Sequence, residues 1–233
     1  MYDFTYRKAS STDEAVKAFG TADDGTYMAG GMTLIPTLKQ RLASPSDVID
    51  LGSVSDLAGI STGGNSITIG AMTTHATVAA SADVRNAIPA LAKLAGGIGD
   101  PAVRHRGTIG GSVANNDPAA DYPSAVLGLA ATVHTNKRDI AADDFFTGMF
   151  ETALEEGELV TGFTCPLPEK AAYSTFPIPA ARYAGVGVFV AKTGSGVRVA
   201  VTGAGPGVFR ATEMEAALSG DFSPKALEGL SVD

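Results

Sequence analysis

The sequence predicts an α+β fold in which short helices and short strands alternate along the chain. Capping residues and apolar positions three or four apart mark the helices, and short apolar runs between turn residues mark the strands. Pro166 and Pro168 end one such strand, and a smaller unit follows them. These observations predict three segments, residues 1–55, 56–170 and 171–233, of which the last is a small C-terminal α/β domain.

The first segment carries signals for two helices and two strands. Ser11 and Glu14 have the spacing of a capping box and begin the first helix. A buried strand over residues 26–30 leads through a glycine-rich stretch into a second helix, which is expected to continue through Leu42. A further strand over residues 47–51 completes a strand–helix–strand order that indicates an α/β unit.

The middle segment is expected to begin with a β-hairpin and a helix that starts near Thr74. Apolar residues at helical spacing predict one further helix over residues 82–95. Residues 96–123 are expected to form a long non-helical loop, and such loops are more often functional than idle. Later helices are expected at 124–131 and 213–218, an acidic element at 141–148, and strands at 132–135, 158–168 and 197–205.

Composition excludes several classes of function. The net charge of −8 argues against a nucleic-acid or anionic-membrane surface. No apolar run approaches the ~20 residues that span a bilayer, and the first residues lack the apolar core of a signal peptide, so a cytoplasmic protein is expected. The single cysteine, Cys165, cannot form an intrachain disulfide or hold an iron–sulfur cluster alone, and three histidines make a zinc site improbable.

Two glycine-rich stretches carry the functional signal. "AGGMT" spans residues 29–33, and "TIGGS" spans residues 108–112. Neither has the spacing of a dinucleotide-binding or P-loop motif. Glycine pairs let backbone N–H groups converge on one point, which suits a diphosphate without adding positive charge. Taken singly, each pair is most simply a tight structural turn.

The residues around these stretches change that balance. With "RLASPSDVIDL" after the first and "NNDPAAD" after the second, they resemble the FAD-binding medium subunit of the molybdenum hydroxylase family. That family includes aerobic carbon monoxide dehydrogenases and the flavin domain of xanthine dehydrogenases. The resemblance implies a two-part FAD-binding domain of the PCMH type, here residues 1–55 and 56–170, followed by the C-terminal domain at 171–233.

The resemblance also implies which positions contact FAD. The first stretch would wrap the pyrophosphate, the second would reach the phosphates and the flavin side, and Asp121 would bond the sugar-like portion. Ile98 and Val160 match apolar contact positions, and Tyr183 could lie against the isoalloxazine ring or be a core tyrosine. The cofactor-binding set is therefore Ala29, Gly30, Gly31, Met32, Thr33, Ile98, Thr108, Ile109, Gly110, Gly111, Ser112, Asp121, Val160 and Tyr183.

Several polar residues allow more than one interpretation. The basic cluster Arg104–Arg106 could face phosphate, a partner subunit or solvent. Asp117 is expected to cap the turn before Pro118, and Asp121 to cap the next helix if it is not a ligand. His75 is expected at a helix N-terminus, and Cys165 as a buried small hydrophobe.

The function implied by the resemblance is that of an FAD-binding electron-transfer subunit without a catalytic residue of its own. Partner subunits would be a large molybdopterin subunit and a small subunit with two [2Fe–2S] clusters, assembled as a dimer of heterotrimers. The final acceptor would be external, such as a quinone or NAD. One alternative is a self-contained FAD-dependent reductase or oxidase of the wider fold that includes the cell-wall precursor reductases. Another is a non-catalytic nucleotide-binding assembly module.

Two departures from the family pattern stand out. Pro177 occupies a position where some relatives have a flavin-contacting lysine, so that contact is not expected here. The sequence ends at Asp233, where relatives usually continue into a further helix, so the packing at the C-terminal end is in doubt.

Overall fold

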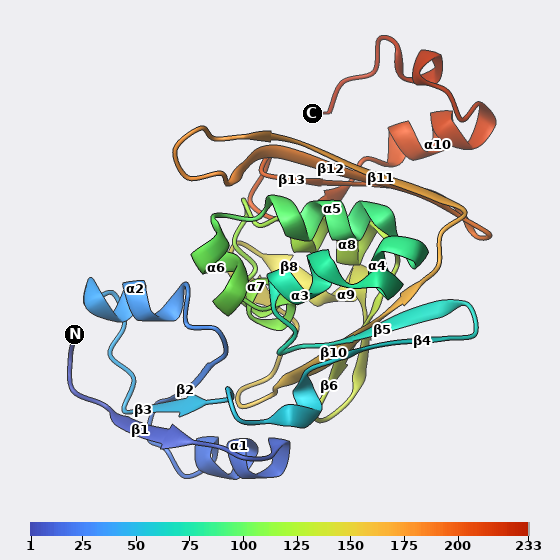
Figure 1. The fold of residues 1–233 in the computed structure, drawn as a ribbon. Helices are drawn as coiled ribbons and strands as arrows, with labels where there is room; N and C mark the ends of the chain where they lie inside the picture. The colour runs from blue at the N-terminus through green and yellow to red at the C-terminus, as the bar shows by residue number, and fades with distance from the viewer. Residues whose placement is uncertain (233) are drawn as a thin grey trace.

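The computed structural model describes residues 1–232, and Asp233, the last residue of the predicted C-terminal domain, lies outside them. Three larger sheets follow one another along the chain, together with a two-stranded pair, β8 (Phe146–Gly148) with β9 (Glu151–Thr152). Figure 1 shows a layer of helices between the second and third of these sheets, with the first sheet beside it. The predicted α+β class is confirmed.

The N-terminal sheet is parallel, with the order β1-β3-β2, and consists of β1 (Thr5–Lys8), β2 (Gly25–Met28) and β3 (Asp47–Asp50). Helix α1 (Thr12–Phe19) connects β1 to β2, and Ser11 caps it by accepting from the backbone N–H of Glu14. The carboxylate of Glu14 accepts in turn from Ser10, one residue earlier than a standard capping box requires. The predicted first helix is confirmed.

Helix α2 (Leu34–Lys39) follows β2 and is shorter than predicted. The sequence suggested continuation through Leu42, but Arg41 has φ of +61°, a left-handed conformation that no helical residue adopts. The amide of Leu42 instead donates to the carbonyl of Thr37, which closes the helix with a turn. The chain then reaches β3 after a short irregular stretch.

The second sheet is antiparallel, with the order β4-β5-β10-β6-β7. Its strands are β4 (Ile60–Gly63), β5 (Ser66–Gly70), β6 (Thr132–Thr135), β7 (Asp139–Ala141) and β10 (Val160–Pro166). The short helix η1 (Ser55–Leu57) precedes β4, and α9 (Ala142–Phe145) follows β7. Ile67, Ile69 and Phe163 are fully buried on its inner face, and each side chain of this size stabilises the fold by about 1.5–3 kcal/mol when buried.

The helical layer contains α3 (His75–Ala80), α4 (Ala82–Ala87), α5 (Pro89–Gly97), α6 (Pro101–Arg106), α7 (Ile109–Asn115) and α8 (Tyr122–Gly128). Thr74 caps α3, as predicted. The single helix predicted over residues 82–95 is wrong, because Ile88 lies outside helical geometry and Pro89 begins a new helix. Proline disfavours the helical conformation in the residue before it, which accounts for this break.

The C-terminal segment is an antiparallel meander of β11 (Lys170–Pro177), β12 (Ala184–Thr193), β13 (Gly196–Thr202) and β14 (Phe209–Arg210), followed by α10 (Thr212–Gly220) and η2 (Pro224–Leu227). Phe189 and Ala200 on one face join the main core with α8, whereas Val199 on the other face packs against Leu218 of α10. Figure 1 shows the sheet lying over α5 and α8. The C-terminal segment therefore shares the core of the preceding one.

Residues 1–232 contain neither a helix suited to span a membrane nor a cluster of metal ligands. No helix in this range is long and apolar enough to cross a membrane. Nor does the described part of the chain contain a group of three or more His, Cys, Asp or Glu side chains placed to hold a metal ion. Cys165 is buried in β10, as expected, and burial raises the pKa of its thiol to about 12.

Candidate functional site

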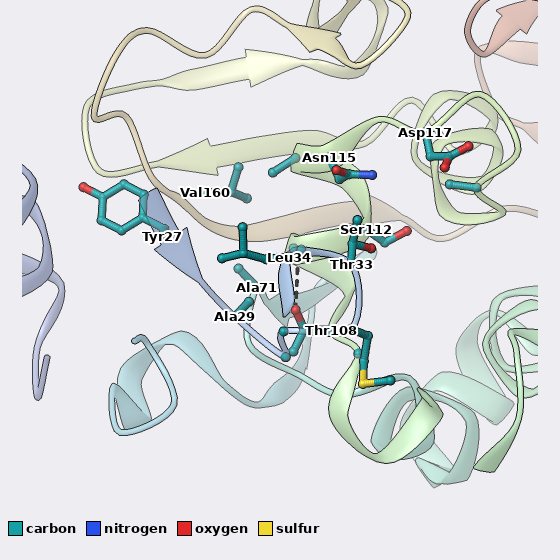
Figure 2. A pocket seen from close by; sticks show the side chains of 18 of the residues that line it. Tyr27, Ala29, Thr33, Leu34, Ala71, Thr108, Ser112, Asn115, Asp117 and Val160 are labelled. Carbon is teal, nitrogen blue, oxygen red and sulfur yellow. Dashed lines mark hydrogen bonds between the residues drawn. The ribbon is translucent and has the colours of Figure 1, made fainter. Parts of the chain in front are cut away.

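A cavity of about 660 Å³ lies where the N-terminal sheet, the helical layer and the C-terminal segment meet. This volume falls within the range of about 300–1,000 Å³ that is typical of cofactor sites. Figure 2 shows residues of the first glycine stretch close to Thr108 and Ser112. Of the predicted contact residues, the cavity wall includes Ala29, Gly30, Gly31, Met32, Thr33, Ile98, Thr108, Gly110, Gly111, Ser112, Asp121, Val160 and Tyr183.

The first glycine stretch forms the connection from β2 to α2. Gly31 has φ of +73°, a conformation that L side chains rarely adopt. The backbone N–H groups of residues 30–34 have no hydrogen-bond partner within the described chain, and the first amide of this region to find one is that of Ile35, which donates to Gly31. Several adjacent unpaired amides at a cavity wall form a concave donor surface that suits an anion.

Gly30 is required for a different reason. A Cβ at this position would lie 1.9 Å from the carbonyl oxygen of Arg106 and 2.9 Å from the Cα of Gly107. The first stretch thus packs directly on the backbone between α6 and α7, although 76 positions separate Gly30 from Arg106 in sequence. Glycine here lets two segments distant in sequence meet at the same wall of the cavity.

The second glycine stretch is not a loop, and this corrects the prediction of a non-helical segment over residues 96–123. Thr108 is the N-cap of α7, and Gly110 and Gly111 lie in its first turn. Gly110 fits closely against the preceding segment, since a Cβ there would lie 2.5 Å from that of Ala71. The sequence predicts a turn at this glycine pair because glycine disfavours helices. The close packing on Ala71 that favours glycine here joins residues far apart in sequence, so the sequence does not reveal it.

The backbone amides of residues 109–111 in the second stretch already donate hydrogen bonds to other groups of the chain. Ile109 donates to the carbonyl of Thr73 at 3.1 Å, Gly110 to that of Ala71 at 2.8 Å, and Gly111 to the Thr108 hydroxyl at 3.1 Å. Ile109 is also the one predicted contact residue that does not line the cavity, because its side chain is 1% exposed and belongs to the core. The two stretches therefore meet at one cavity but offer it different groups.

Asp117 and Asp121 occupy the turn between α7 and α8. The carboxylate of Asp117 accepts from the amide of Ala119, which confirms the predicted cap of the turn around Pro118. Asp121 stands at the N-cap position of α8, but its side chain makes no capping bond, which leaves the other predicted role, that of a cofactor ligand, as the expectation. Its carboxylate accepts instead from the hydroxyl of Tyr173 at 2.5 Å. Burial raises the pKa of Asp121, and the Tyr173 bond opposes that rise.

His75 begins α3, as predicted, and also lines the cavity. Its ring is 4% exposed and lies against Tyr122, with 5.2 Å between ring centroids. Burial, and then the charge of Arg104, lower the pKa of His75 to about 4, so the ring is neutral at pH 7. Its Nδ1 and the hydroxyl of Tyr122 find no hydrogen-bond partner among the described residues. Burial raises the pKa of Tyr122, so the phenol also stays neutral.

The basic cluster divides between two roles. Arg104 donates to the carbonyls of Ile98 and Gly99 at 2.9 Å each, so it holds the segment that follows α5. His105 and Arg106 are exposed. Neither arginine lines the cavity, and the single Lys or Arg side chain that does so within residues 1–232 is Arg182.

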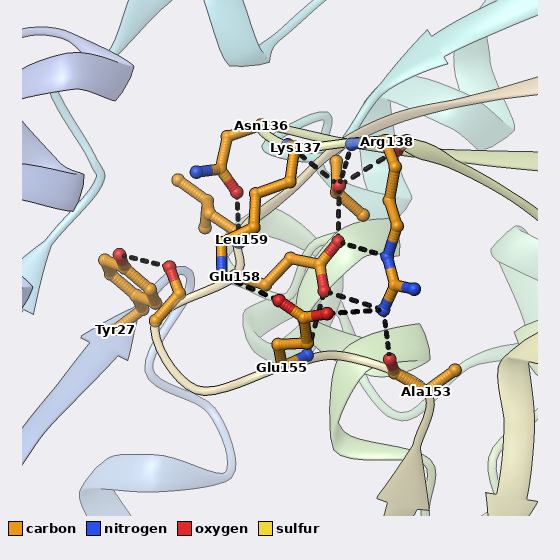
Figure 3. Close-up of polar contacts among 10 residues, drawn as sticks. Tyr27, Asn136, Lys137, Arg138, Ala153, Glu155, Glu158 and Leu159 are labelled. Atoms are coloured by element: carbon orange, nitrogen blue, oxygen red, sulfur yellow. Dashed lines mark hydrogen bonds and ion pairs between the residues drawn. The ribbon is translucent and has the colours of Figure 1, made fainter.

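Of the cavity wall formed by residues 154–160, sequence reasoning predicted Val160 alone and missed residues 154–159. Gly157 has φ of +69°, and its carbonyl accepts from the hydroxyl of Tyr27 in β2 at 3.1 Å. Figure 3 shows this segment held from the other side by Arg138, which pairs with Glu158 at 3.1 Å and donates to Ala153. The positive φ at Gly157 is typical of glycine, but the partners lie too far away in sequence to be predicted.

Glu158 is an unusual buried carboxylate. Its side chain is 0% exposed, and burial alone would raise its pKa. Hydrogen bonds from Arg138, the amide of Glu155 and the hydroxyl of Thr135 outweigh this, and they lower the pKa to about 2. The ionised side chain is therefore a fixed structural group that ties residues 154–160 to Thr135 and Arg138, at the β6–β7 turn of the second sheet.

Known proteins resemble this chain over most of its length. The family described as "FAD binding domain in molybdopterin dehydrogenase" matches residues 2–168. The nicotine 6-hydroxylase medium subunit of Paenarthrobacter nicotinovorans is 35% identical over 97% of this chain and 84% of its own length. The glyceraldehyde dehydrogenase medium chain of Sulfolobus acidocaldarius is 34% identical over 91% and 80%. A carbon monoxide dehydrogenase structure from Hydrogenophaga pseudoflava superposes with a TM-score of 0.89 at 35% identity, covering 96% of this chain and 83% of that one.

Proposed function

Since this chain belongs to the family of FAD-binding domains of molybdopterin dehydrogenases, we propose that it is the electron-transfer flavoprotein subunit of such a complex. Its partners would be a large molybdopterin subunit and a small [2Fe–2S] subunit, assembled as a dimer of heterotrimers. The single observation that carries the proposal is the row of unpaired amides at residues 30–34 on the wall of a cofactor-sized cavity.

The residues present fit FAD. Its diphosphate needs several donors, and neutral amides supply them in a cavity that is also lined by Asp117, Glu155 and Glu158. A chain with a net charge of −8 has little bulk attraction for an anion, so local donors must supply the affinity. The methyl group of Ala29 and the lack of a side chain at Gly31 would let the backbone approach the phosphates closely.

Each wall would hold a different part of the cofactor. The amides of residues 30–34 and the Thr33 hydroxyl would bind the diphosphate, with Ser112 beside them. Asp121 would accept a hydrogen bond from a sugar-like hydroxyl. Ile98 and Val160 would exclude water from the bound cofactor, and Tyr183 would lie against the isoalloxazine. FAD, when bound, supplies the redox chemistry between the iron–sulfur clusters of a partner and an external acceptor such as a quinone or NAD.

Purification of the native complex tests the proposal. We expect one larger and one smaller partner chain to co-purify with this one. Metal analysis of the complex should detect iron and molybdenum, and the complex should hold one FAD for each copy of this chain. Substrate-dependent flavin reduction by this chain alone would instead indicate a self-contained flavoenzyme. A complex that holds this chain without FAD would refute the electron-transfer role and favour an assembly module.

A further inference from the structure

The turn that carries Asp121 is held by the C-terminal sheet. The hydroxyl of Thr202, at the end of β13, donates to the carbonyls of Pro118 at 3.0 Å and Ala120 at 2.7 Å. The amide of Gly203 donates to Pro118 at 2.8 Å, and Tyr173 in β11 donates to Asp121 at 2.5 Å. All three donors lie beyond residue 168, where the match to the FAD-binding domain ends. Part of the cavity wall thus depends on a segment outside that domain.

Among these contacts, the one from Tyr173 reaches the side chain that faces the cavity. Asp121 is 9% exposed, and of the described side chains only Tyr173 donates a hydrogen bond to its carboxylate. A carboxylate buried to this extent needs a donor to stay ionised and to keep one orientation. A short bond from a neutral phenol to Oδ1 meets both needs, and no other described side chain donates to this carboxylate.

The position of the Tyr173 hydroxyl is itself specified by its surroundings. Tyr173 is 5% exposed, its ring lies near that of Phe189, and Lys93 donates to its carbonyl at 3.2 Å. On the neighbouring strand β12, a Cβ at Gly187 would lie only 2.5 Å from the phenolic oxygen. Glycine at this position therefore leaves room for the Tyr173 hydroxyl that donates to Asp121.

We propose that Tyr173 is a positioning residue for the FAD site: it fixes the Asp121 carboxylate toward a sugar-like hydroxyl of the cofactor, and so makes the C-terminal sheet part of that site. This inference rests on the proposed function, in which Asp121 is a cofactor contact. Tyr173 acts through Asp121 and does not itself line the cavity.

The test compares FAD affinity of four full-length apo variants by flavin fluorescence titration. Loss of one hydrogen bond to a charged group predicts that Tyr173→Phe weakens FAD binding by about tenfold or more. Asp121→Asn should weaken it as well, and the double variant should be no weaker than Asp121→Asn alone. Tyr6→Phe is the matched control, because Tyr6 also donates to a carboxylate, that of Asp50, but lies outside the cavity. It should bind FAD as the wild-type chain does.

The pH profile separates positioning from a general loss of packing. Removing the Tyr173 hydroxyl takes away a bond that favours ionised Asp121, so the pKa of Asp121 rises further. As the pH falls, Tyr173→Phe should therefore lose FAD affinity at a higher pH than the wild-type chain. Of the other titratable groups around the turn, Tyr122 interacts with Asp121 directly. His75 lies against Tyr122, Asp117 stands in the same turn, and Lys93 donates to the Tyr173 carbonyl. All of them remain in Asp121→Asn, so a shift that they caused would persist in that background, whereas a shift caused by the Asp121 carboxyl should disappear.

Gly187→Ala provides a second variant that keeps the tyrosine, because its Cβ would lie 2.5 Å from the same hydroxyl and 2.9 Å from Cγ2 of Thr202. It should weaken FAD binding when Asp121 is present and cause no further loss when it is combined with Asp121→Asn. Unchanged FAD affinity in both Tyr173→Phe and Gly187→Ala, beside a weakened Asp121→Asn, would overturn the inference and leave the proposed function intact. An equal loss from Tyr173→Phe with and without Asp121 would also overturn it. A wild-type chain that binds no FAD would refute both.

Discussion

Gly30→Ala is the sharpest perturbation of the cavity, because it changes space without changing the backbone conformation that the residue needs. Gly30 has no positive φ, so alanine could adopt its geometry. Its Cβ, however, would lie 1.9 Å from the carbonyl oxygen of Arg106, and a normal contact begins at 3.4 Å. The two segments must separate by about 1.5 Å, and overpacking of this kind costs about 1–3 kcal/mol.

The same displacement moves the amides of residues 30–34 away from the diphosphate. If two of these hydrogen bonds are lost at about 0.5–1.5 kcal/mol each, FAD affinity should fall by roughly 5- to 150-fold. Fluorescence titration of the apo chain with FAD measures the loss. Gly220→Ala, at the end of α10 and with no atom within 4 Å of its Cβ position, is the matched control. Wild-type FAD affinity in Gly30→Ala would refute the assignment of this stretch to the diphosphate.

Two further predictions concern the walls around this stretch. Glu158→Gln should lower the free energy of unfolding at pH 7 by about 1–2 kcal/mol, after allowance for the 44% exposure of Arg138. Because the pKa of Glu158 is lowered from 4.5 to about 2, this stabilisation exists above pH 4.5 and disappears as the pH falls toward 2. Identical urea-unfolding profiles of both proteins across that window would contradict it. Thr108→Val should cost about 1 kcal/mol in the same assay through loss of the α7 cap, and no change would argue against that cap.

Local chemistry made the short elements predictable. Ser11 and Thr74 cap helices where their spacing indicated, because each bond joins residues three apart in sequence. The β4–β5 hairpin and the strand ending at Pro166 follow from equally local signals. Residues of both glycine stretches also lie together in the folded chain, at the wall of one cavity. Membership of the family, inferred from these motifs, is confirmed by the comparisons.

At the site, the sequence is uninformative where a partner distant in the chain decides the role of a residue. Asp121 has the sequence position of a helix cap, yet its carboxylate bonds to Tyr173, 52 residues away. No sequence pattern marked Glu158 as a buried residue, because its side chain pairs with Arg138 and the neighbouring Gly157 accepts a hydrogen bond from Tyr27 of β2. No periodicity in sequence reports such contacts, and each lies between segments that meet only in the folded chain.

The two glycine stretches look equivalent in sequence, but the structure gives them opposite hydrogen-bonding states. At Gly110 and Gly111 the amides are satisfied within the chain, and at Gly30 and Gly31 they are not. An anion gains most from donors that would otherwise stay unpaired, since it breaks no existing bond. The diphosphate is therefore expected against the first stretch. The second stretch acts as the surface on which the first one is placed, because the α6–α7 junction that precedes it touches Gly30 directly.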